Sequence, residues 1–470
     1  MGEVLQQIDP SHNTKSGNIF RFDTGPSLFT MPFVLDELFQ FAGRERSDLL
    51  TFEPINPLCR YFFPDGSRLD AVSNLEQMCD QIEQIAPGQA KAYRNYLSYS
   101  ERIYRLTADV FLHRPIHEWR KLLDWRLLPS LLRLPQIDPF RTVHGANAGF
   151  FSDARLVQLF DRYATYNGSN PFVAPATLNI IPYVEYVLGG YYIKGGIYRL
   201  TEALVKLAQE NEVEIVTGVH VSEILHNHIN VTGIKTRGEK IAADFVLCGA
   251  DVVETYRSLL TDFPRYCARL DKLEPSLSGM VFLWSVVGEQ PNLAQHNIIF
   301  SKDYESEFSQ IFWEKRDPDD PTIYIAITSK NDPDHAPSGC ENWFVLLNMP
   351  YLAPKQNWQE AKDRMRAIVL EKLQKLNLLQ QDRIIAETCY TPMDFYELYR
   401  SNRGSIYGIS SNSRSMAFRR PPNRDRNLAG LYFSGGSVHP GGGVPLVLLS
   451  GKIASGLIAE HAGIGHPYNY

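Results

Sequence analysis

The sequence predicts a multidomain α/β protein. At 470 residues the chain is longer than one simple hydrophobic core supports, so we expect two or three domains. Strand patterns cluster at residues 213–247 and 276–350, and helical patterns fill most of residues 71–165. A strand, a glycine-rich turn and an apolar helix then follow one another at residues 431–449. Strands and helices that alternate along a chain in this way indicate the α/β class.

The composition is that of a globular protein, with 44% hydrophobic, 12% aromatic and 21% charged residues. A net charge of −6 and a pI near 6.1 argue against nucleic acid as a partner. The six cysteines form no C-x-x-C pair and have no histidine at zinc spacing. We therefore expect no metal, and reduced structural thiols in a cytoplasmic protein. Residues 1–20 are polar and no run of eighteen apolar residues occurs, so we expect neither a signal peptide nor a membrane span.

The first two expected elements are a helix and a strand. Residues 30–43 place Leu35, Leu38 and Phe39 on one face and end at Gly43, which predicts an amphipathic helix. Residues 58–67 read as a strand followed by a turn.

A largely helical region is predicted for residues 71–165, divided by Pro115, Pro129, Pro135 and Pro139. Within it, residues 119–134 mix Leu and Trp with Arg and Lys, as an interfacial helix does. A helix packed on its own domain fits the same periodicity. The Asn-Gly and Asn-Pro pairs of residues 167–171 predict a loop over residues 161–172.

A helix is next expected from residue 198, with core positions at Leu200, Ala203, Leu204 and Leu207. Strands are predicted at residues 213–216, 219–225, 228–234 and 240–247, and aromatic strands at 280–284, 322–327 and 343–347. The aromatic strands suit a sheet that floors an apolar tunnel, and plain core packing is the alternative. Residues 358–376 predict an amphipathic helix.

The glycine-rich turn near the C-terminus is the most informative stretch. Five glycines lie between residues 435 and 443, directly after a buried strand pattern, and Pro445 lies in the first turn of the next helix. Such a turn lets backbone approach a planar or anionic ligand and directs a positive helix end toward it. A glycine-rich loop without a ligand is the alternative.

This turn, with His439 to Pro445 as its core, resembles the flavin-binding signature of the bacterial carotenoid desaturase family, within the FAD-dependent amine oxidase superfamily. The form of residues 435–450 is most similar to that of the hydroxycarotenoid 3,4-desaturases. Gly436 stands where more distant relatives have an acidic residue. The family's C-R-Y-F-x-P-D-G element is matched at residues 59–66, and further blocks of resemblance lie at 161–176, 191–204 and 400–408.

The resemblance implies an α/β fold with a Rossmann-like FAD-binding domain, a mixed-sheet substrate domain and a helical membrane-associating region. The implied boundaries are 1–70 for a remnant FAD segment and the start of the substrate domain, 71–170 for the helical region that gives the substrate access, 171–265 for a second FAD segment, 266–410 for the substrate-binding sheet and helices, and 411–470 for the C-terminal FAD segment. The resemblance is nearly continuous from Arg21, yet no G-x-G-x-x-G turn or ribose-binding acid is found. We therefore expect the N-terminal βαβ unit to be absent and FAD to be bound weakly or not at all.

The resemblance also implies site residues. Asp153 and Arg155 stand where the family places a polar pair near the substrate channel, so they are the catalytic candidates, and a helix-start aspartate in solvent is the alternative for Asp153. The positive helix end at Val444 would stabilise negative charge on the reduced flavin. The candidate cofactor-binding residues are Gly25, Pro26, Val221, Gly249, Ala250, Gly435, Gly436, Gly442, Gly443, Val444 and Pro445.

The implied activity is FAD-dependent desaturation of an acyclic, 1-hydroxylated carotenoid end at its 3,4 bond, by hydride transfer to the flavin. The implied partners are the carotenoid and a lipid surface, with the protein peripheral on the cytoplasmic face of the membrane. Three alternatives remain. These are a flavin amine oxidase, which would not carry the His439 to Gly443 form, a carotenoid isomerase, and a truncated protein without turnover.

Overall fold

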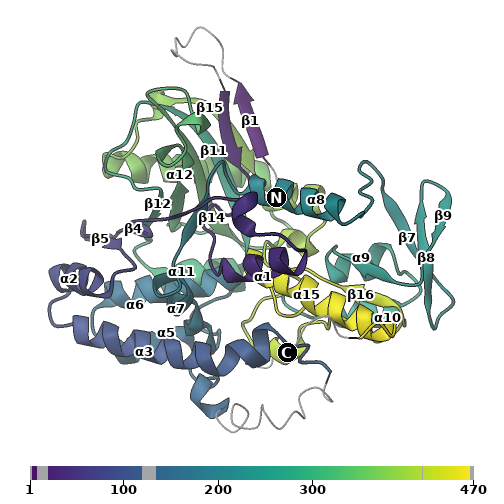
Figure 1. Ribbon diagram of the computed structural model, residues 1–470. Helices are drawn as coiled ribbons and strands as arrows, with labels where there is room; N and C mark the ends of the chain where they lie inside the picture. The colour runs from purple at the N-terminus through teal and green to yellow at the C-terminus, as the bar shows by residue number, and fades with distance from the viewer. Residues whose placement is uncertain (1–2, 8–18, 119–133, 415, 466–470) are drawn as a thin grey trace.

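The protein is described by a computed structural model over residues 3–7, 19–118, 134–414 and 416–465 (Figure 1). Its centre is a seven-stranded sheet in the order β15-β11-β14-β13-β12-β4-β5. The neighbours in this sheet are antiparallel except β12 and β4, which are parallel. The strands are β4 Cys59–Phe62, β5 Arg68–Ala71, β11 Ser278–Val287, β12 His296–Ile299, β13 Ile323–Ala326, β14 Cys340–Met349 and β15 Ile384–Tyr390. The predicted aromatic strands are thus confirmed.

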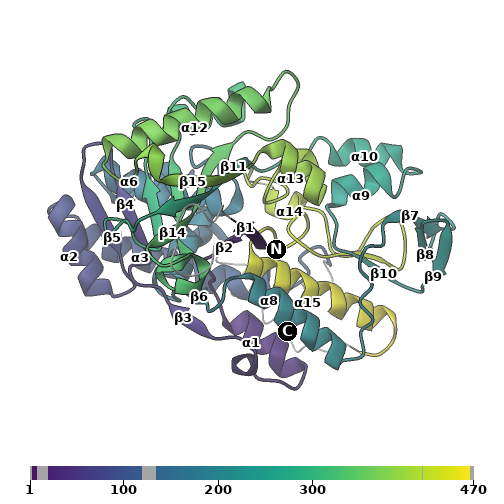
Figure 2. The same ribbon diagram turned by 90° about the horizontal axis from the view of Figure 1, so that it is seen from above.

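Both faces of this sheet are covered. Trp284 of β11 lies opposite Trp343 of β14, and both are buried beneath the helix α12 Trp358–Lys375, whose Met365 and Leu373 share their cluster (Figure 2). On the other face, a hairpin of β1 Glu3–Gln7 and β2 Ile19–Asp23 packs Phe20 and Phe22 against β11. The first described elements are therefore an antiparallel hairpin rather than a βαβ unit.

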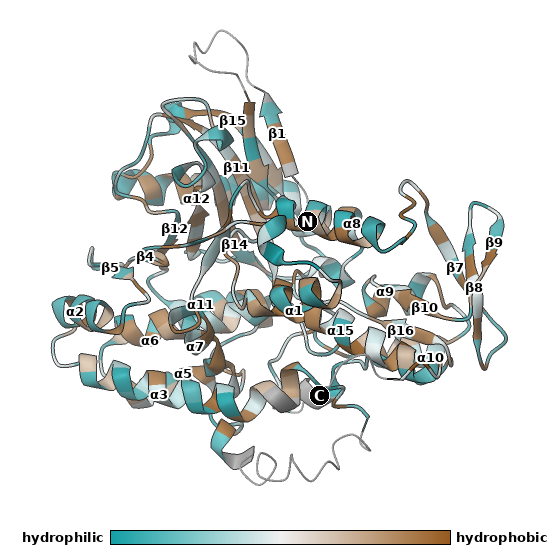
Figure 3. Cartoon of the chain, viewed as in Figure 1, coloured by the Kyte–Doolittle hydropathy of each residue, from teal (hydrophilic) through white to brown (hydrophobic). Residues whose placement is uncertain are grey.

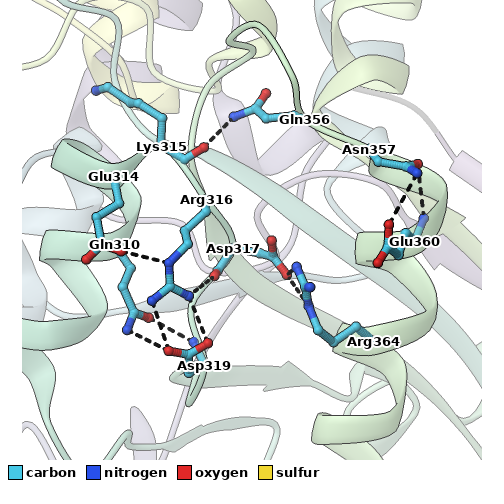
Figure 4. Close-up of polar contacts among 10 residues, drawn as sticks. All are labelled: Gln310, Glu314, Lys315, Arg316, Asp317, Asp319, Gln356, Asn357, Glu360 and Arg364. Carbon is cyan, nitrogen blue, oxygen red and sulfur yellow. Dashed lines mark hydrogen bonds and ion pairs between the residues drawn. The ribbon is translucent and has the colours of Figure 1, made fainter.

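Figure 3 shows hydrophobic residues concentrated on the strands of this sheet, whereas the helix α8 Tyr198–Glu210 alternates between hydrophobic and hydrophilic residues. Ion pairs hold the connection that precedes β13 against α12 (Figure 4). Arg316 binds Glu314 at 2.7 Å and Asp319 at 2.8 Å, and Arg364 of α12 binds Asp317. These contacts tie the connection between η9 Gln310–Glu314 and β13 to α12.

A helical subdomain lies at one end of the sheet (Figure 1). Tyr93, Tyr96, Phe160 and Tyr163 stack in its centre. The predicted helical region is thus confirmed where it is described, while the predicted loop at 161–172 opens as a 3-10 helix, η7. Its elements are α2 Leu75–Ile85, α3 Ala90–Thr107, the π-helical turn η3 Ala108–Leu112, η6 Leu134–Ile137, α5 Val143–Phe150, α6 Ala154–Asp161, η7 Arg162–Asn167, η8 Ala176–Asn179, α7 Ile180–Tyr186 and α11 Tyr304–Ser309.

The remaining elements lie at the opposite end, with β7–β9 outermost in Figures 1 and 2. Three small sheets form among them, the antiparallel β7-β8-β9, the antiparallel pair β3-β6 and the parallel pair β10-β16. Helices α1, α8 and α15 share a hydrophobic cluster that includes Leu35, Leu200 and Leu448. The elements are α1 Phe33–Phe41, η2 Arg46–Asp48, β3 Phe52–Pro54, β6 Tyr191–Ile193, α8 Tyr198–Glu210, β7 Val221–His226, β8 Val231–Thr236, β9 Glu239–Ala242, β10 Val246–Cys248, α9 Val252–Ser258, α10 Pro264–Leu270, α13 Pro392–Tyr399, η13 Asn402–Gly404, α14 Met416–Arg419, β16 Leu431–Phe433 and α15 Val444–His461; three further 3-10 turns are η10 Thr328–Lys330, η11 Pro333–His335 and η12 Gln381–Arg383.

The strand predicted at residues 213–216 is wrong. This segment pairs with no strand among the described residues, and its apolar side chains are exposed, with Val213 at 53% and Val216 at 63%. A strand is defined by hydrogen bonds to a neighbour, which a local pattern cannot supply. Leu247 on β10 is 45% exposed as well, so an apolar edge remains on this side of the molecule.

Within the described chain, one helix has the length and composition of a membrane span, α15, and 33% of that stretch is buried. It packs against α1 and β16, and the core helix of a water-soluble domain meets the same criteria. All six cysteines are free, as expected. The predicted domain boundaries stay predictions.

Candidate functional site

The site is built on the junction between β16 and α15. β16 runs parallel to β10, and the backbone N–H of Ser434 donates to the Cys248 carbonyl at 3.1 Å as the strand ends. Residues 435–443 turn the chain into α15, with Pro445 in its first turn and Gly443 (φ 112°) at the position before it. The N-cap residue, Gly443, has no side chain that could cap this helix start. Its backbone N–H groups and positive end are thus available to a ligand.

Close packing requires glycine at Gly442 of this turn and at Gly408 beside it. A Cβ on Gly442 would lie 3.1 Å from the Cα, Cβ and carbonyl oxygen of Tyr407, and a Cβ on Gly408 (φ 72°) would lie 2.8 Å from the Cα of Ser437. On its other side, Tyr407 contacts Gly168, where an added Cβ would lie 2.9 Å from the tyrosine ring. The turn and the loop after η7 therefore meet through Tyr407, with no room for side chains between them.

The Arg420 side chain stabilises the turn through hydrogen bonds to backbone carbonyls. Its guanidinium donates to the carbonyls of Gly436 at 3.1 Å and Ile409 at 2.8 Å, and it is buried. Burial lowers the pKa of Arg420 to about 10. Since no carboxylate among the described residues pairs with Arg420, its positive charge is left to act on the turn.

Three further side chains fix the turn. The Asn423 amide donates to the Phe433 and His439 carbonyls at 3.2 and 2.9 Å, and the Ser450 hydroxyl donates to the same His439 carbonyl at 2.8 Å. The Nε2 of His439 lies 2.9 Å from the Arg114 carbonyl. Burial lowers the pKa of His439 to about 3, so the ring is neutral and donates this bond.

Most of the predicted cofactor-binding residues lie close to one another, and one lies apart. Gly435 lies against Gly249, whose carbonyl would be 3.5 Å from a Cβ on Gly435, and the Ser437 hydroxyl accepts a bond from the N–H of Val252, two residues beyond Ala250. Gly25 and Pro26 lie in the loop between Asp23, which accepts the Ile197 N–H at 2.9 Å, and Phe29, which shares a cluster with Val444. This loop therefore flanks the first turn of α15. Val221 lies apart, at the start of β7 in the three-stranded sheet.

Asp153 and Arg155 lie at the start of α6. Asp153 is the N-cap and accepts the Arg155 backbone N–H at 2.9 Å, and the Arg155 side chain pairs with both Asp153 and Asp65. Hydrogen bonding from Arg155 lowers the pKa of Asp153. Arg155 also donates to the Ile85 carbonyl, so the pair joins α6 to α2 and to the turn before β5. The catalytic roles of both residues stay predictions.

Comparison with known proteins identifies the family of this chain. The sequence profile described as flavin containing amine oxidoreductase matches residues 11–459. The chain belongs to this family. It is 40% identical over 442 residues to a 1-hydroxycarotenoid 3,4-desaturase of Flavobacterium sp. (strain P99-3), covering 93% of this chain and 89% of the relative. It is 36% identical over 445 residues to a 4,4'-diapolycopene oxygenase of Methylomonas sp., covering 94% and 88%.

Solved structures show the same fold at low identity. A triple mutant of putrescine oxidase aligns with a TM-score of 0.57 over 97% of this chain and 90% of its own, at 11% identity. Cyclohexylamine oxidase from Brevibacterium oxydans aligns with a TM-score of 0.53 over 94% and 88%, at 13% identity. These structures confirm the expected α/β fold. The family match confirms that this flavoprotein is an oxidoreductase with the expected FAD cofactor.

The described residues fit the ring end of FAD. The bare backbone at Gly442 and Gly443, the uncapped start of α15 and the buried charge of Arg420 all suit a planar group that becomes negative on reduction. For the diphosphate end, the described residues contain no strand, turn and helix with the G-x-G-x-x-G spacing.

Sequence patterns missed Tyr407, Arg420, Asn423 and Ser450, because single residues of these common types carry no local signal. They also missed the one group of described residues that could hold a metal ion, His226, His228 and Asp262 at the tip of β7, whose ligand atoms lie within 4.8 Å of one another. The expected absence of a metal stays a prediction.

Proposed function

We propose that this flavoprotein is a carotenoid desaturase that introduces the 3,4 double bond into an acyclic, 1-hydroxylated carotenoid end. The single observation that supports this most is the 40% identity to a 1-hydroxycarotenoid 3,4-desaturase over 93% of this chain.

Desaturation removes a hydride and a proton from adjacent carbons, and bound FAD accepts the hydride and its two electrons. The residues of this chain then have three tasks. Gly442 and Tyr407 set the distance between the ring site and the loop after η7. The start of α15 and Arg420 stabilise negative charge at the reduced ring. Asp153 is proposed to accept the proton, with its low pKa sufficient because a polyene disperses positive charge.

The protein is further proposed to lie peripherally on the cytoplasmic face of a membrane, where its lipid-soluble substrate is dissolved. Residues 111–140 are the proposed docking surface. The basic and aromatic positions at 119–133 that motivate it lie outside the described residues.

A second candidate is oxygenation of a carotenoid end. It is favoured by the 36% identity to a 4,4'-diapolycopene oxygenase and by 34% identity to a 4,4'-diaponeurosporene oxygenase of Staphylococcus haemolyticus. Isomerisation of a carotenoid is a third, since it uses the same cofactor and substrate class.

The test is the product formed from a 1-hydroxylated carotenoid, phytoene and lycopene, each supplied separately in detergent to the FAD-loaded protein. A red-shifted product two hydrogens lighter, formed from the hydroxylated substrate alone, is expected. Conversion of phytoene but not of the hydroxylated substrate would overturn the 3,4 assignment. A product with an added oxygen would establish the oxygenase, and a product of unchanged mass the isomerase.

A further inference from the structure

A buried polar cluster lies where β4 and β12 meet η7 and α7. The Arg162 guanidinium donates to the Tyr61 hydroxyl at 2.8 Å and pairs with Glu185 at 3.3 Å. The hydroxyls of Tyr163 and Tyr166 also donate to Glu185. Both charges are nearly inaccessible, with side chains 7% and 1% exposed, so the pair neutralises itself within the protein.

His296 of β12 lies beside this cluster and is incompletely bonded. Its Nδ1 lies 2.8 Å from the Tyr324 hydroxyl, and the two rings stack at 6.0 Å. Its Nε2 has no hydrogen-bond partner among the described residues, although His296 is only 2% exposed. A buried polar atom without a partner destabilises the fold, so this nitrogen marks a place for a polar ligand atom.

The charge state of His296 restricts that ligand. Burial and the charge of Arg162 lower the pKa of His296 to about 3. The neutral ring has one N–H donor and one acceptor nitrogen, and the Tyr324 hydroxyl can serve either tautomer. A hydroxyl group can likewise donate or accept, so it pairs with Nε2 in both tautomers, whereas a hydrocarbon pairs with neither.

The cluster is connected to the flavin site from two sides. The Tyr324 hydroxyl also bonds the side chain of Ser27, which directly follows Gly25 and Pro26. At the other side, Tyr166 precedes Asn167 and Gly168, and Gly168 packs on the Tyr407 that contacts Gly442. The Oδ1 of Asn167 is a second buried atom without a partner among the described residues.

From this geometry we infer that His296, held by Tyr324, is the subsite that binds the hydroxyl group of the carotenoid end, with Asn167 Oδ1 as the acceptor of its hydrogen when Nε2 is the donor. This inference rests on the proposed function and adds the group that selects a hydroxylated end over a hydrocarbon end. In such a substrate the hydroxyl oxygen is three bonds from the nearer reacting carbon. The hydroxyl group must therefore bind close to the flavin. The His296 subsite meets this requirement, because it is connected to the loop that flanks α15 and to the loop packed on Tyr407.

The experiment measures binding and turnover of two acyclic carotenoids in detergent, one 1-hydroxylated and one hydrocarbon. Wild type is compared with His296→Phe and His296→Gln. His296→Phe preserves an aromatic ring but removes the polar nitrogen, and it should weaken binding of the hydroxylated carotenoid about 10- to 100-fold. The same variant should leave the Kd of the hydrocarbon carotenoid unchanged. His296→Gln, which retains a donor and an acceptor, should restore part of the preference.

The matched control is His335→Phe, the same change at another buried histidine whose pKa is also lowered by burial. It should leave the preference intact. An equal loss for both carotenoids in His296→Phe would make His296 a packing residue, and an unchanged preference would mean that Nε2 binds only water. Either result overturns the inference. Failure of wild type to convert any carotenoid would overturn the proposed function instead, so the two failures are distinguishable.

Discussion

The close backbone contact between Gly442 and Tyr407 gives the sharpest test of the flavin site. In Gly442→Ala the new Cβ would lie 3.1 Å from the Cα, Cβ and carbonyl oxygen of Tyr407. These atoms belong to or adjoin the backbone and cannot rotate away, and Tyr407 is itself held against Gly168. Overpacking of this kind costs about 1–3 kcal/mol, and Gly442→Val, with two more methyl groups, should lie at the upper end.

Two measurements follow this change. Urea unfolding should give a lower midpoint for Gly442→Ala and a still lower one for Gly442→Val, and the flavin absorbance per protein should fall in the same order. Gly451→Ala is the matched control, because it lies in the same helix, α15, and its added Cβ meets no atom within 4 Å. That control should be more stable than wild type by about 0.5–1 kcal/mol. Wild-type stability and flavin content in Gly442→Ala would refute the close approach of Tyr407.

Three other changes test the remaining assignments. Asp153→Asn should keep the helix cap, because asparagine caps equally well, but lower turnover about 10²-fold or more as a proton acceptor is lost; unchanged turnover would leave the cap as its only role. Because the folded pKa of Asp153 is lowered from 3.8, its stabilisation is present above that value and is lost as the pH falls through the folded pKa, so the variant should lose less stability in acid than wild type. Arg420→Met should cost about 2–3 kcal/mol in urea unfolding and release flavin, because two buried carbonyls lose a charged donor, and an unchanged unfolding midpoint would contradict this. Glutamate at four basic positions should reduce liposome co-sedimentation, at about 1 kcal/mol per residue, and unchanged binding would move the docking surface elsewhere; the positions are Arg120, Lys121, Arg126 and Arg133.

The sequence predicts those parts of the fold that depend on local pattern. The apolar run of β11 and the periodicity of α12 each specify one element, and both occur within three residues of their expected ends. Residues 213–216 carry an equally good strand pattern and form no strand, because pairing depends on a neighbour that the pattern does not contain. The hairpin of β1 and β2 was missed for a related reason. Its anchor is Gln6, whose side chain bonds Leu283 and Ser285 almost 280 residues away.

The same distinction divides the candidate site. The candidate cofactor turn is recognisable in the sequence because its backbone geometry requires two consecutive glycines. A Cβ on Gly442 would crowd against Tyr407, and Gly443 has a φ of 112°. The turn is supported from outside by Tyr407, Arg420 and Asn423. Each is a common residue type in an ordinary sequence context, so none of them forms a recognisable motif. They stabilise the turn through their burial and their contacts with its backbone. Neither property can be seen in the local sequence pattern.

Substrate choice must then be determined outside the turn. The relatives of this chain carry the names of a 3,4-desaturase and of oxygenases at 34–40% identity, yet all are matched along nearly their whole length. The turn is proposed to hold the flavin ring through its backbone, and such contacts do not depend on whether the carotenoid end carries a hydroxyl group, so the turn cannot by itself separate a hydroxylated end from a hydrocarbon one. The groups that can are side chains on the sheet beside it. Among the described residues, His296 has an unpaired buried nitrogen there, and its partner Tyr324 reaches the loop that flanks α15. Differences in reaction among proteins that share the turn are therefore expected at such positions of β12 and β13 rather than in the glycines.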